Sequence, residues 1–286
     1  MALSQDRGPD VGGPLRRRSW SPLASMPRTR RTRVVRGIQY AVFVVLLVAV
    51  VLTVDWPTIR EGYFNLDKAR PLFPEVLTTA LKNTLIYTAM GFAFGLVLGL
   101  VLALMRLSQV APYRWLANIY IEFFRGIPLL LWLFFLGYGV PTATGRQLPF
   151  SPYSAIVLGL GMPAAAYLAE TIRAGIQAVP KGQLEAARSL GMSQPRAMVS
   201  IVIPQAFRII IPPLTNELIV LTKDSSLVAI LGVTVGTKEL TKFGRDELNT
   251  LVNATPLVVA GLCYLLITIP LSLLVRRLEA RNARAR

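Results

Sequence analysis

Long apolar runs separated by short charged segments dominate this sequence of 286 residues, of which 53% are hydrophobic and 16% are charged. A helix needs roughly 20 apolar residues to cross a hydrocarbon core, and a soluble domain usually carries about a quarter charged residues. Six runs approach or reach this length, at residues 38–54, 84–105, 116–140, 153–172, 206–221 and 257–275. The pattern therefore predicts an all-α membrane protein with about six transmembrane helices.

The basic residues are distributed unevenly around these runs. If the N-terminus is cytoplasmic, 21 of the 31 Lys and Arg residues fall in cytoplasmic segments, and eight of the 15 Asp and Glu residues fall in outer segments. Lys and Arg accumulate on the cytoplasmic side of membrane proteins, so we expect both termini to be cytoplasmic. Because the charges flank the spans, the net charge of +16 indicates membrane lipid as a partner rather than nucleic acid.

The chain divides into segments around the spans. Residues 1–37 are basic, and no cleavage site of small residues follows the first run, so we expect a disordered cytoplasmic tail rather than a signal peptide. Residues 38–54 form an added N-terminal helix, and residues 55–75 form an outer linker. Residues 76–278 then form the transmembrane domain, and residues 279–286 form a basic tail.

Residue counts limit the chemistry of the chain. It contains no histidine, which excludes a histidine base, a histidine triad and a histidine metal site. Its single cysteine, Cys263, excludes an intrachain disulfide. The phosphate-binding pattern G-x-x-x-x-G-K-[ST] does not occur either. We therefore expect neither catalytic residues nor a metal site, and any nucleotide must bind to another protein.

Small residues recur every four positions in the second run, at Gly91, Gly95 and Gly99, and Ala103 continues the series. Helices in lipid associate through close packing, which small residues permit. This stripe predicts a tight helix–helix contact, either inside the bundle or between two copies of the chain.

Prolines interrupt the fourth run at Pro163 and the fifth run at Pro212-Pro213. Proline lacks an N–H, so a carbonyl one turn earlier is left without its helical partner. We expect bends there that face protein or a water-filled path. After the fifth run, residues 227–235 are apolar but too few to span a bilayer, which predicts one or two short outer helices.

Charged side chains also occur in or beside the spans, where they favour the bundle interior or a solvated path. Glu122 and Arg125 stand three residues apart, as do Glu170 and Arg173, so each pair can meet on one helix face. Glu217 has no basic neighbour at helical spacing, and a substrate ammonium group would serve as its partner. The candidate substrate path comprises Glu122, Arg125, Glu170, Asn216, Glu217, Lys223, Asp224 and Ser225.

Residues 180–204 form a charged loop between the fourth and fifth runs. Residues 183–190 lack helix breakers, which predicts a helix of two turns. Gly191 is a natural helix stop, and Ser193 is suited to cap a second helix that returns to the membrane. The small side chains of Ala186 and Ala187 leave a face that a partner can approach closely, although an ordinary loop helix would show the same composition.

This loop carries the pattern E-A-A-x3-G-x9-I-x-[LI]-P from Glu185 to Pro204. The pattern resembles the motif of permease subunits of binding-protein-dependent ABC importers. Other stretches are similar to the polar amino-acid branch of that family (the histidine, arginine, glutamine, glutamate and opine group), at residues 122–130, 166–176, 182–187 and 223–227. The resemblance covers about residues 76–278, and several separate motifs in the right order make it specific.

The resemblance implies a type I importer core of five helices, here preceded by one added helix, in a bacterial inner membrane. It also implies a second permease subunit, identical or related, two ATPase subunits and an extracytoplasmic amino-acid-binding protein. ATP and Mg²⁺ would bind to the ATPases, and no cofactor would bind to this chain. The residues that the resemblance assigns to ATPase coupling are Gly182, Glu185, Ala186, Ala187, Arg188, Gly191 and Pro204.

Two other functions stay open. An ion-coupled amino-acid carrier would use Glu122, Glu170 or Glu217 for proton linkage, and a non-transporting membrane scaffold would recruit partners through its basic tail. The carrier leaves the pattern from Glu185 to Pro204 unexplained. The amino acid itself also stays open, since we expect the binding protein to set most of the selectivity.

Overall fold

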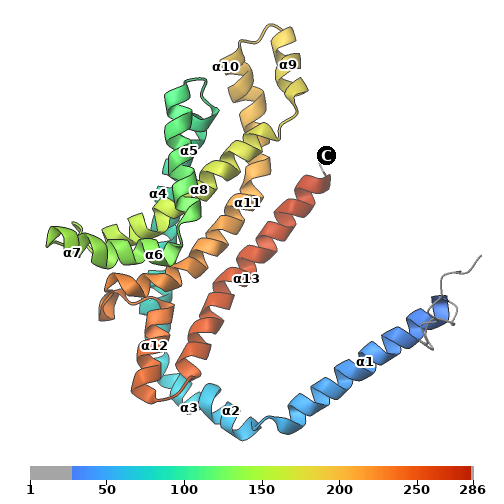
Figure 1. Cartoon of the computed structure of the whole chain (residues 1–286), viewed down its shortest axis with the longest axis vertical. Helices are drawn as coiled ribbons and strands as arrows, with labels where there is room; N and C mark the ends of the chain where they lie inside the picture. The colour runs from blue at the N-terminus through green and yellow to red at the C-terminus, as the bar shows by residue number, and fades with distance from the viewer. Residues whose placement is uncertain (1–27, 285–286) are drawn as a thin grey trace, which may run out of the picture. The chain divides into compact units, whose positions relative to one another are not determined.

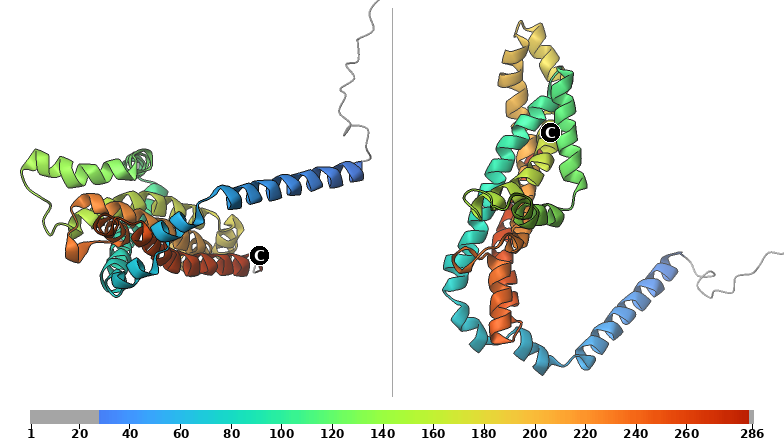
Figure 2. Two further views of the ribbon diagram at one scale, coloured as in Figure 1. Left: turned by 90° about the horizontal axis from the view of Figure 1, so that it is seen from below. Right: turned by 60° about the vertical axis from the view of Figure 1, so that its left-hand side comes forward.

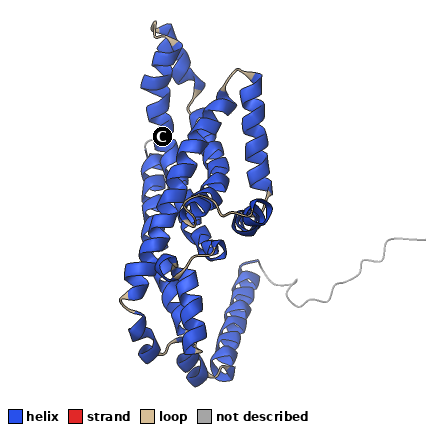
Figure 3. Cartoon of the chain, turned by 90° about the vertical axis from the view of Figure 1, so that its left-hand side faces the viewer, coloured by secondary structure: helices blue, strands red, loops and turns tan. Residues whose placement is uncertain are grey.

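A computed structural model describes residues 28–284, and these divide into two compact units between Trp56 and Pro57. Figure 3 shows helices joined by loops, and no β-strand occurs in the part of the chain that the structure describes. The all-α prediction is therefore confirmed. Most of the predicted N-terminal tail, residues 1–27, lies outside the described residues.

The first unit contains α1, which runs from Arg28 to Thr53. This helix begins ten residues before the predicted start at Ile38, because no glycine or proline occurs between Arg28 and Arg36 and arginine is a good helix former. Residues Thr32–Thr53 are long and apolar enough to cross a membrane, and none of that window is buried inside the protein. The helix therefore presents apolar side chains on all sides, as expected of a helix surrounded by lipid.

The second unit contains the remaining helices, with short 3₁₀ and π segments between them (Figure 1). Before the third predicted span come α2 Trp56–Tyr63, α3 Leu66–Ala69, η1 Arg70–Leu72, η2 Val76–Leu81 and α4 Lys82–Leu107. The middle of the unit comprises α5 Ala111–Gly126, α6 Leu129–Phe134, η3 Phe135–Gly139, α7 Val140–Thr144, α8 Tyr153–Gln177 and α9 Lys181–Ser189. The last part comprises α10 Gln194–Ala197, η4 Met198–Val202, α11 Ile203–Asp224, η5 Ser225–Leu231, η6 Val235–Thr237, α12 Leu240–Leu251 and α13 Thr255–Arg284.

Helix α8 lies at the centre of the second unit. Inside the protein, 61% of its most apolar window is buried, compared with 33% for the span that contains α4 and 17% for the span that contains α13. Helices α4, α5 and α11 all pack against it. One hydrophobic cluster contains buried Ile121 of α5, Ala166 of α8 and Ala206 of α11, so α8 holds the neighbouring spans together.

The glycine stripe of α4 packs directly against α8. A Cβ atom added to Gly95 would lie 3.1 Å from the carbonyl oxygen of Gly161, and one added to Gly99 would lie 3.0 Å from that of Ala165. Only glycine allows the two backbones to approach so closely. The stripe therefore makes its contact inside this chain.

The third predicted span is not one helix. Residues Ala111–Gly126 and Leu129–Thr144 are two helical stretches that meet at a bend of 99°. A residue before proline is forced out of the helical region, and Ile127, before Pro128, has φ −90° and ψ 134°. The structure thus has five helices able to cross a membrane among the described residues, or six if the bent pair counts as one span.

The prolines of the fourth and fifth runs, Pro163 and Pro212-Pro213, do not break their helices, and bends at these positions stay a prediction. Helix α8 continues through Pro163, and α11 continues through both prolines of the fifth run. Pro163 and Pro212 are buried, so neighbouring protein surrounds the helix where a backbone hydrogen bond is missing. The span that includes α11 extends over 38 residues, Gln194–Leu231, far beyond the predicted 206–221.

The last predicted span, 257–275, is also too short. Helix α13 continues to Arg284, through most of the predicted basic tail. Residues 276–284 contain no glycine or proline that would end it. The basic residues at its end therefore lie on a helix that extends directly from the membrane span.

Candidate functional site

Helices α9 and α10 form a helical hairpin at one end of the second unit (Figures 1 and 2). Helix α9 ends where Gly191 adopts the left-handed conformation, with φ +87°. That conformation turns the chain back, so the Met192 N–H donates to the Ala187 carbonyl at 3.1 Å. Ser193 occupies the N-cap position of α10, as predicted, although its side chain makes no capping hydrogen bond.

One face of α9 is anchored and the other is free. Ala187 is buried, and Leu184 packs against the hydrophobic cluster of the unit. Gln205 of α11 donates from its side chain to the Gln183 amide oxygen at 3.3 Å, which adds a polar link between the two helices.

The free face of the hairpin carries the remaining residues of the pattern. Glu185, Ala186 and Arg188 are exposed, and Leu190 is 85% exposed at the tip. Exposed apolar side chains beside charges are typical of a surface that another protein covers. Of the other residues assigned to coupling, Gly182 is exposed in the first turn of α9, Gly191 is exposed in the turn after it, and Pro204 lies at the start of α11.

An ionic cluster joins α4 to α8 near the same end of the unit. Glu170 pairs with Arg173 on its own helix, with Nη2 at 2.8 Å from Oε2, as the spacing of three predicts. Glu170 also pairs with Arg106 of α4, a contact that was not predicted. Arg106 continues the face of the small-residue stripe, three positions after Ala103, and this spacing was a usable signal.

The other predicted pair does not form. Glu122 and Arg125 are both exposed on α5, and no ion pair joins them in the described part of the chain. The spacing of three allows contact but does not enforce it, because exposed pairs gain little and lose side-chain freedom. Neither residue lines the cavity described next.

A cavity of about 410 Å³ lies among α4, α5, α8, α11 and η5. Glu217 and Asp224 of α11 both line it, seven residues and therefore about two helical turns apart. No described ion pair includes either carboxylate. The wall also contains aromatic rings that were not predicted, from Phe92, Phe124 and Tyr167.

The structure separates the other predicted path residues from this cavity. Asn216 and Lys223 are exposed, and neither lines it. Ser225 is buried and donates its hydroxyl to the Thr222 carbonyl at 2.7 Å, which gives it a structural role at the end of α11. Glu170 forms its ion pair with Arg106 instead.

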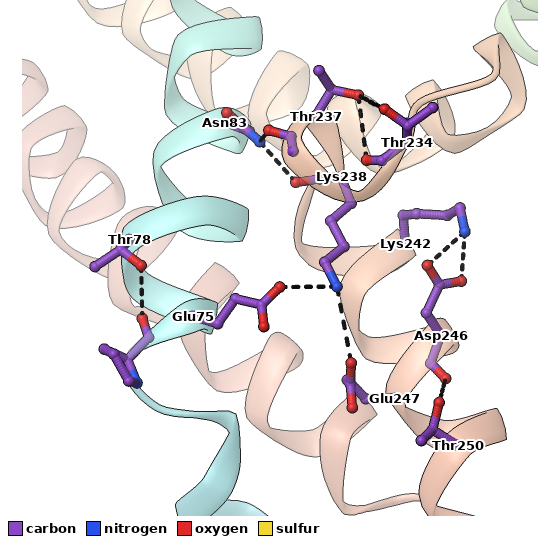
Figure 4. Close-up of polar contacts among 12 residues, drawn as sticks. Glu75, Thr78, Asn83, Thr234, Thr237, Lys238, Lys242, Asp246, Glu247 and Thr250 are labelled. Carbon is purple, nitrogen blue, oxygen red and sulfur yellow. Dashed lines mark hydrogen bonds and ion pairs between the residues drawn. The ribbon is translucent and has the colours of Figure 1, made fainter.

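A polar cluster at the opposite end of the unit ties α12 to the start of α4. Figure 4 shows Lys238 between Glu75 and Glu247, with its Nζ at 3.0 Å and 3.9 Å from their carboxylate oxygens. Asn83 of α4 donates to the Lys238 carbonyl at 3.0 Å. These contacts fix the segment between η5 and α12 against α4.

Glu239, next in sequence, caps α12. Its carboxylate is fully buried and accepts hydrogen bonds from the Thr241 and Lys242 N–H groups and from the Tyr264 hydroxyl. Burial raises the pKa of Glu239 from its ordinary value of 4.5 to about 7, although the hydrogen bonds oppose this rise. This carboxyl group therefore titrates close to neutral pH.

The comparison with known families identifies the chain. Residues 95–284 match the family described as binding-protein-dependent transport system inner membrane component. The chain belongs to this family. The resemblance inferred from the pattern between Glu185 and Pro204 is thereby confirmed, and this inner membrane component is a multi-pass membrane protein.

Relatives of this inner membrane component cover most of its length. The probable glutamine ABC transporter permease protein GlnM of Bacillus subtilis is 42% identical over 70% of this chain and 89% of its own. The glutamate/aspartate import permease protein GltK of Escherichia coli O157:H7 is 37% identical over 77% of this chain and 99% of its own.

A solved structure supports the same fold. The crystal structure of an amino acid ABC transporter with histidines has a chain that is 36% identical and superposes with a TM-score of 0.67. The match covers 77% of this inner membrane component and 98% of that chain. The five-helix importer core predicted from the resemblance is therefore confirmed as the fold of the second unit.

Proposed function

We propose that this inner membrane component is the permease subunit of an ATP-driven importer of polar amino acids. The observation that carries the proposal is the α9–α10 hairpin, which presents Glu185, Ala186, Arg188 and Leu190 on one exposed face and is anchored by Ala187 beneath it. Relatives that cover most of the chain are named as amino-acid permeases, which supports the substrate class.

The coupling mechanism follows from how the hairpin is attached. Two ATPase subunits, which bind ATP and Mg²⁺, would dock on the hairpins of two permease subunits, and an amino-acid-binding protein would deliver the solute to the other side. Under this proposal the ATPases carry out the hydrolysis, and no cofactor would bind to this chain. Because α10 continues through η4 into α11, movement of the hairpin reaches Glu217 and Asp224 in the cavity.

The same arrangement supports a cytoplasmic C-terminus. One hollow of the second unit is lined by both Gln183 of α9 and Asn282 near the end of α13, so the hairpin and the C-terminal helix end lie on the same side of the membrane. ATP is cytoplasmic, which supports a cytoplasmic position for both. The excess of Lys and Arg in residues 1–37 supports the same side for the N-terminus.

The cavity is suited to an amino acid. Two carboxylates without a described cationic partner favour an ammonium group, and the rings of Phe92, Phe124 and Tyr167 offer apolar contact. At about 410 Å³ the cavity is within the usual size range of small-ligand sites. We propose Glu217 and Asp224 as the solute-contacting residues of this path.

Co-purification and reconstitution test the proposal. The transporter purified through this chain should contain an ATPase, and proteoliposomes of the complex should take up a polar amino acid only with ATP and binding protein. Glu185→Ala and Gly191→Val should lower uptake strongly while ATP hydrolysis by the bound ATPase persists. Glu61→Ala, an exposed carboxylate of α2, is the matched control and should leave uptake unchanged.

Two results would overturn the proposal. Uptake that continues without ATP and stops on adding an uncoupler would indicate an ion-coupled carrier. Normal coupled uptake in both hairpin variants would show that the ATPase does not act through α9.

A further inference from the structure

A second hollow, of about 370 Å³, lies between α11 and α13. Its lining residues are Arg208, Ile211, Pro212, Leu278, Arg281 and Asn282. The Asn282 side-chain amide donates to the Arg208 carbonyl at 2.7 Å, so the two helices are fastened together at this point. We call these six residues the α11–α13 groove.

The groove combines positive charge with an apolar wall. Arg208 and Arg281 are both exposed, and none of the described ion pairs reaches either guanidinium. Glu279 is the carboxylate nearest to Arg281 in sequence, and it takes part in none of these ion pairs. Two like charges beside one hollow repel each other unless an anion lies between them. Half-buried Ile211 and Leu278 continue the groove as hydrocarbon.

The depth of the groove in the membrane follows from the length of α13. Roughly 20 residues of helix cross the hydrocarbon core, so a span that starts at Thr255 reaches the far interface near Val275. Arg276 and Arg277 follow immediately, and Arg281 lies about one further turn outward. The groove therefore lies at the level of lipid headgroups, with its apolar wall toward the acyl chains.

We propose that the α11–α13 groove binds the phosphate of an anionic phospholipid. Guanidinium groups bind phosphate through paired N–H donors, and basic pockets between helices at the cytoplasmic surface suit anionic headgroups. The two arginines hold the headgroup, and Ile211 and Leu278 contact the first carbons of an acyl chain.

The bound lipid would also adjoin the hairpin. A neighbouring hollow of about 830 Å³ shares Arg208 and Asn282 with the groove and is lined on its other side by Pro180 and Gln183 of the 180–204 loop. A headgroup on Arg208 would therefore lie next to the hollow that Pro180 and Gln183 line. The site itself rests on the geometry of the groove and needs no transport activity to be tested.

Native mass spectrometry of the purified full chain tests the proposal by titration with phosphatidylglycerol or phosphatidylcholine. The groove variant Arg208→Gln/Arg281→Gln removes two charges that line the hollow. The control variant Arg276→Gln/Arg277→Gln removes two charges from the same helix end that do not line it. Each charge near the surface contributes about 1 kcal/mol, so we expect roughly tenfold to 30-fold weaker phosphatidylglycerol binding in the groove variant alone.

The outcomes separate the possible occupants. Loss of phosphatidylglycerol in the groove variant, with the control variant and phosphatidylcholine binding unchanged, supports the site. Equal loss in both double variants would show general attraction to basic helix ends and would overturn it. Displacement of the lipid by millimolar inorganic phosphate would assign the groove to free phosphate. A disulfide-linked dimer formed through Leu278→Cys would assign it to a second copy of the chain, and either result would refute the lipid proposal.

Discussion

Gly99 offers the sharpest test of how the transmembrane core is held together. Its substitution by alanine would place a Cβ atom 3.0 Å from the Ala165 carbonyl oxygen and 3.2 Å from the Ala169 amide nitrogen. Both atoms belong to the backbone of α8, which cannot rotate away as a side chain can. The helices must therefore separate slightly along the stripe, which weakens the packing that joins α4 to α8.

Two opposing terms set the size of this effect. Overpacking in a closely packed interior costs about 1–3 kcal/mol, and a backbone clash places Gly99→Ala near the upper end of that range. Alanine gains about 1 kcal/mol over glycine within a helix. The net loss is therefore about 2 kcal/mol. For a chain of this length, that loss lowers the midpoint of thermal unfolding, Tm, by roughly 4–8 °C.

Thermal unfolding in detergent, followed by circular dichroism at 222 nm, measures the shift. Gly261→Ala is the matched control, because Gly261 lies within the span of α13 and nothing lies within 4 Å of an added Cβ. The control should keep or raise the Tm. If Gly99→Ala raised the Tm as much as the control does, the two backbones would not be in close contact.

Three further predictions concern charged residues. Arg106→Gln should lower the Tm by several degrees in the native chain and by less in a Glu170→Gln background, because the pair that it breaks is already absent there; equal losses in both backgrounds would exclude a direct pair. The pKa of Glu239 is about 7 in the folded state and 4.5 ordinarily, so the folded state binds this proton more tightly than the unfolded state. The free energy of unfolding is therefore highest below pH 4.5 and falls by up to about 3 kcal/mol as the pH rises to 7. The Tm of the native chain should fall over this range more steeply than that of Glu239→Gln, and parallel curves would contradict it. Glu217→Gln should raise the KM of amino-acid uptake roughly tenfold with assembly unchanged, as expected for about 1.4 kcal/mol of lost ammonium attraction; an unaltered KM would remove Glu217 from the path.

The membrane spans were predictable because lipid requires long apolar runs, and the runs are visible in the sequence. Their breaks were not. Pro128 ends a helix, whereas Pro163 and Pro212 lie inside helices that continue. Proline removes the same N–H in each case, and the outcome depends on whether neighbouring helices enclose the weakened turn. That enclosure is a tertiary property, and the local sequence does not contain it.

The hairpin was predictable to within a few residues for a different reason. Gly191, together with Ser193 and Pro195 at the start of the next helix, encodes the turn locally, and the structure has the turn there. The contact between Arg106 and Glu170 joins two helices that are far apart in the chain. It could have been predicted only by assigning the small-residue stripe of α4 to a contact with α8. The aromatic wall of the cavity, which includes Tyr167, has no periodic signal and required the packed structure.

The continuity of α11 through its two prolines makes this helix a lever arm. Roughly 20 Å of uninterrupted helix separate Ile203, beside the hairpin, from Glu217. Over that length, a tilt of about 5° at the hairpin end displaces the carboxylate by roughly 2 Å, enough to break or form a hydrogen bond to a solute. A modest swing of the hairpin would thus be amplified into a change of binding geometry at Glu217.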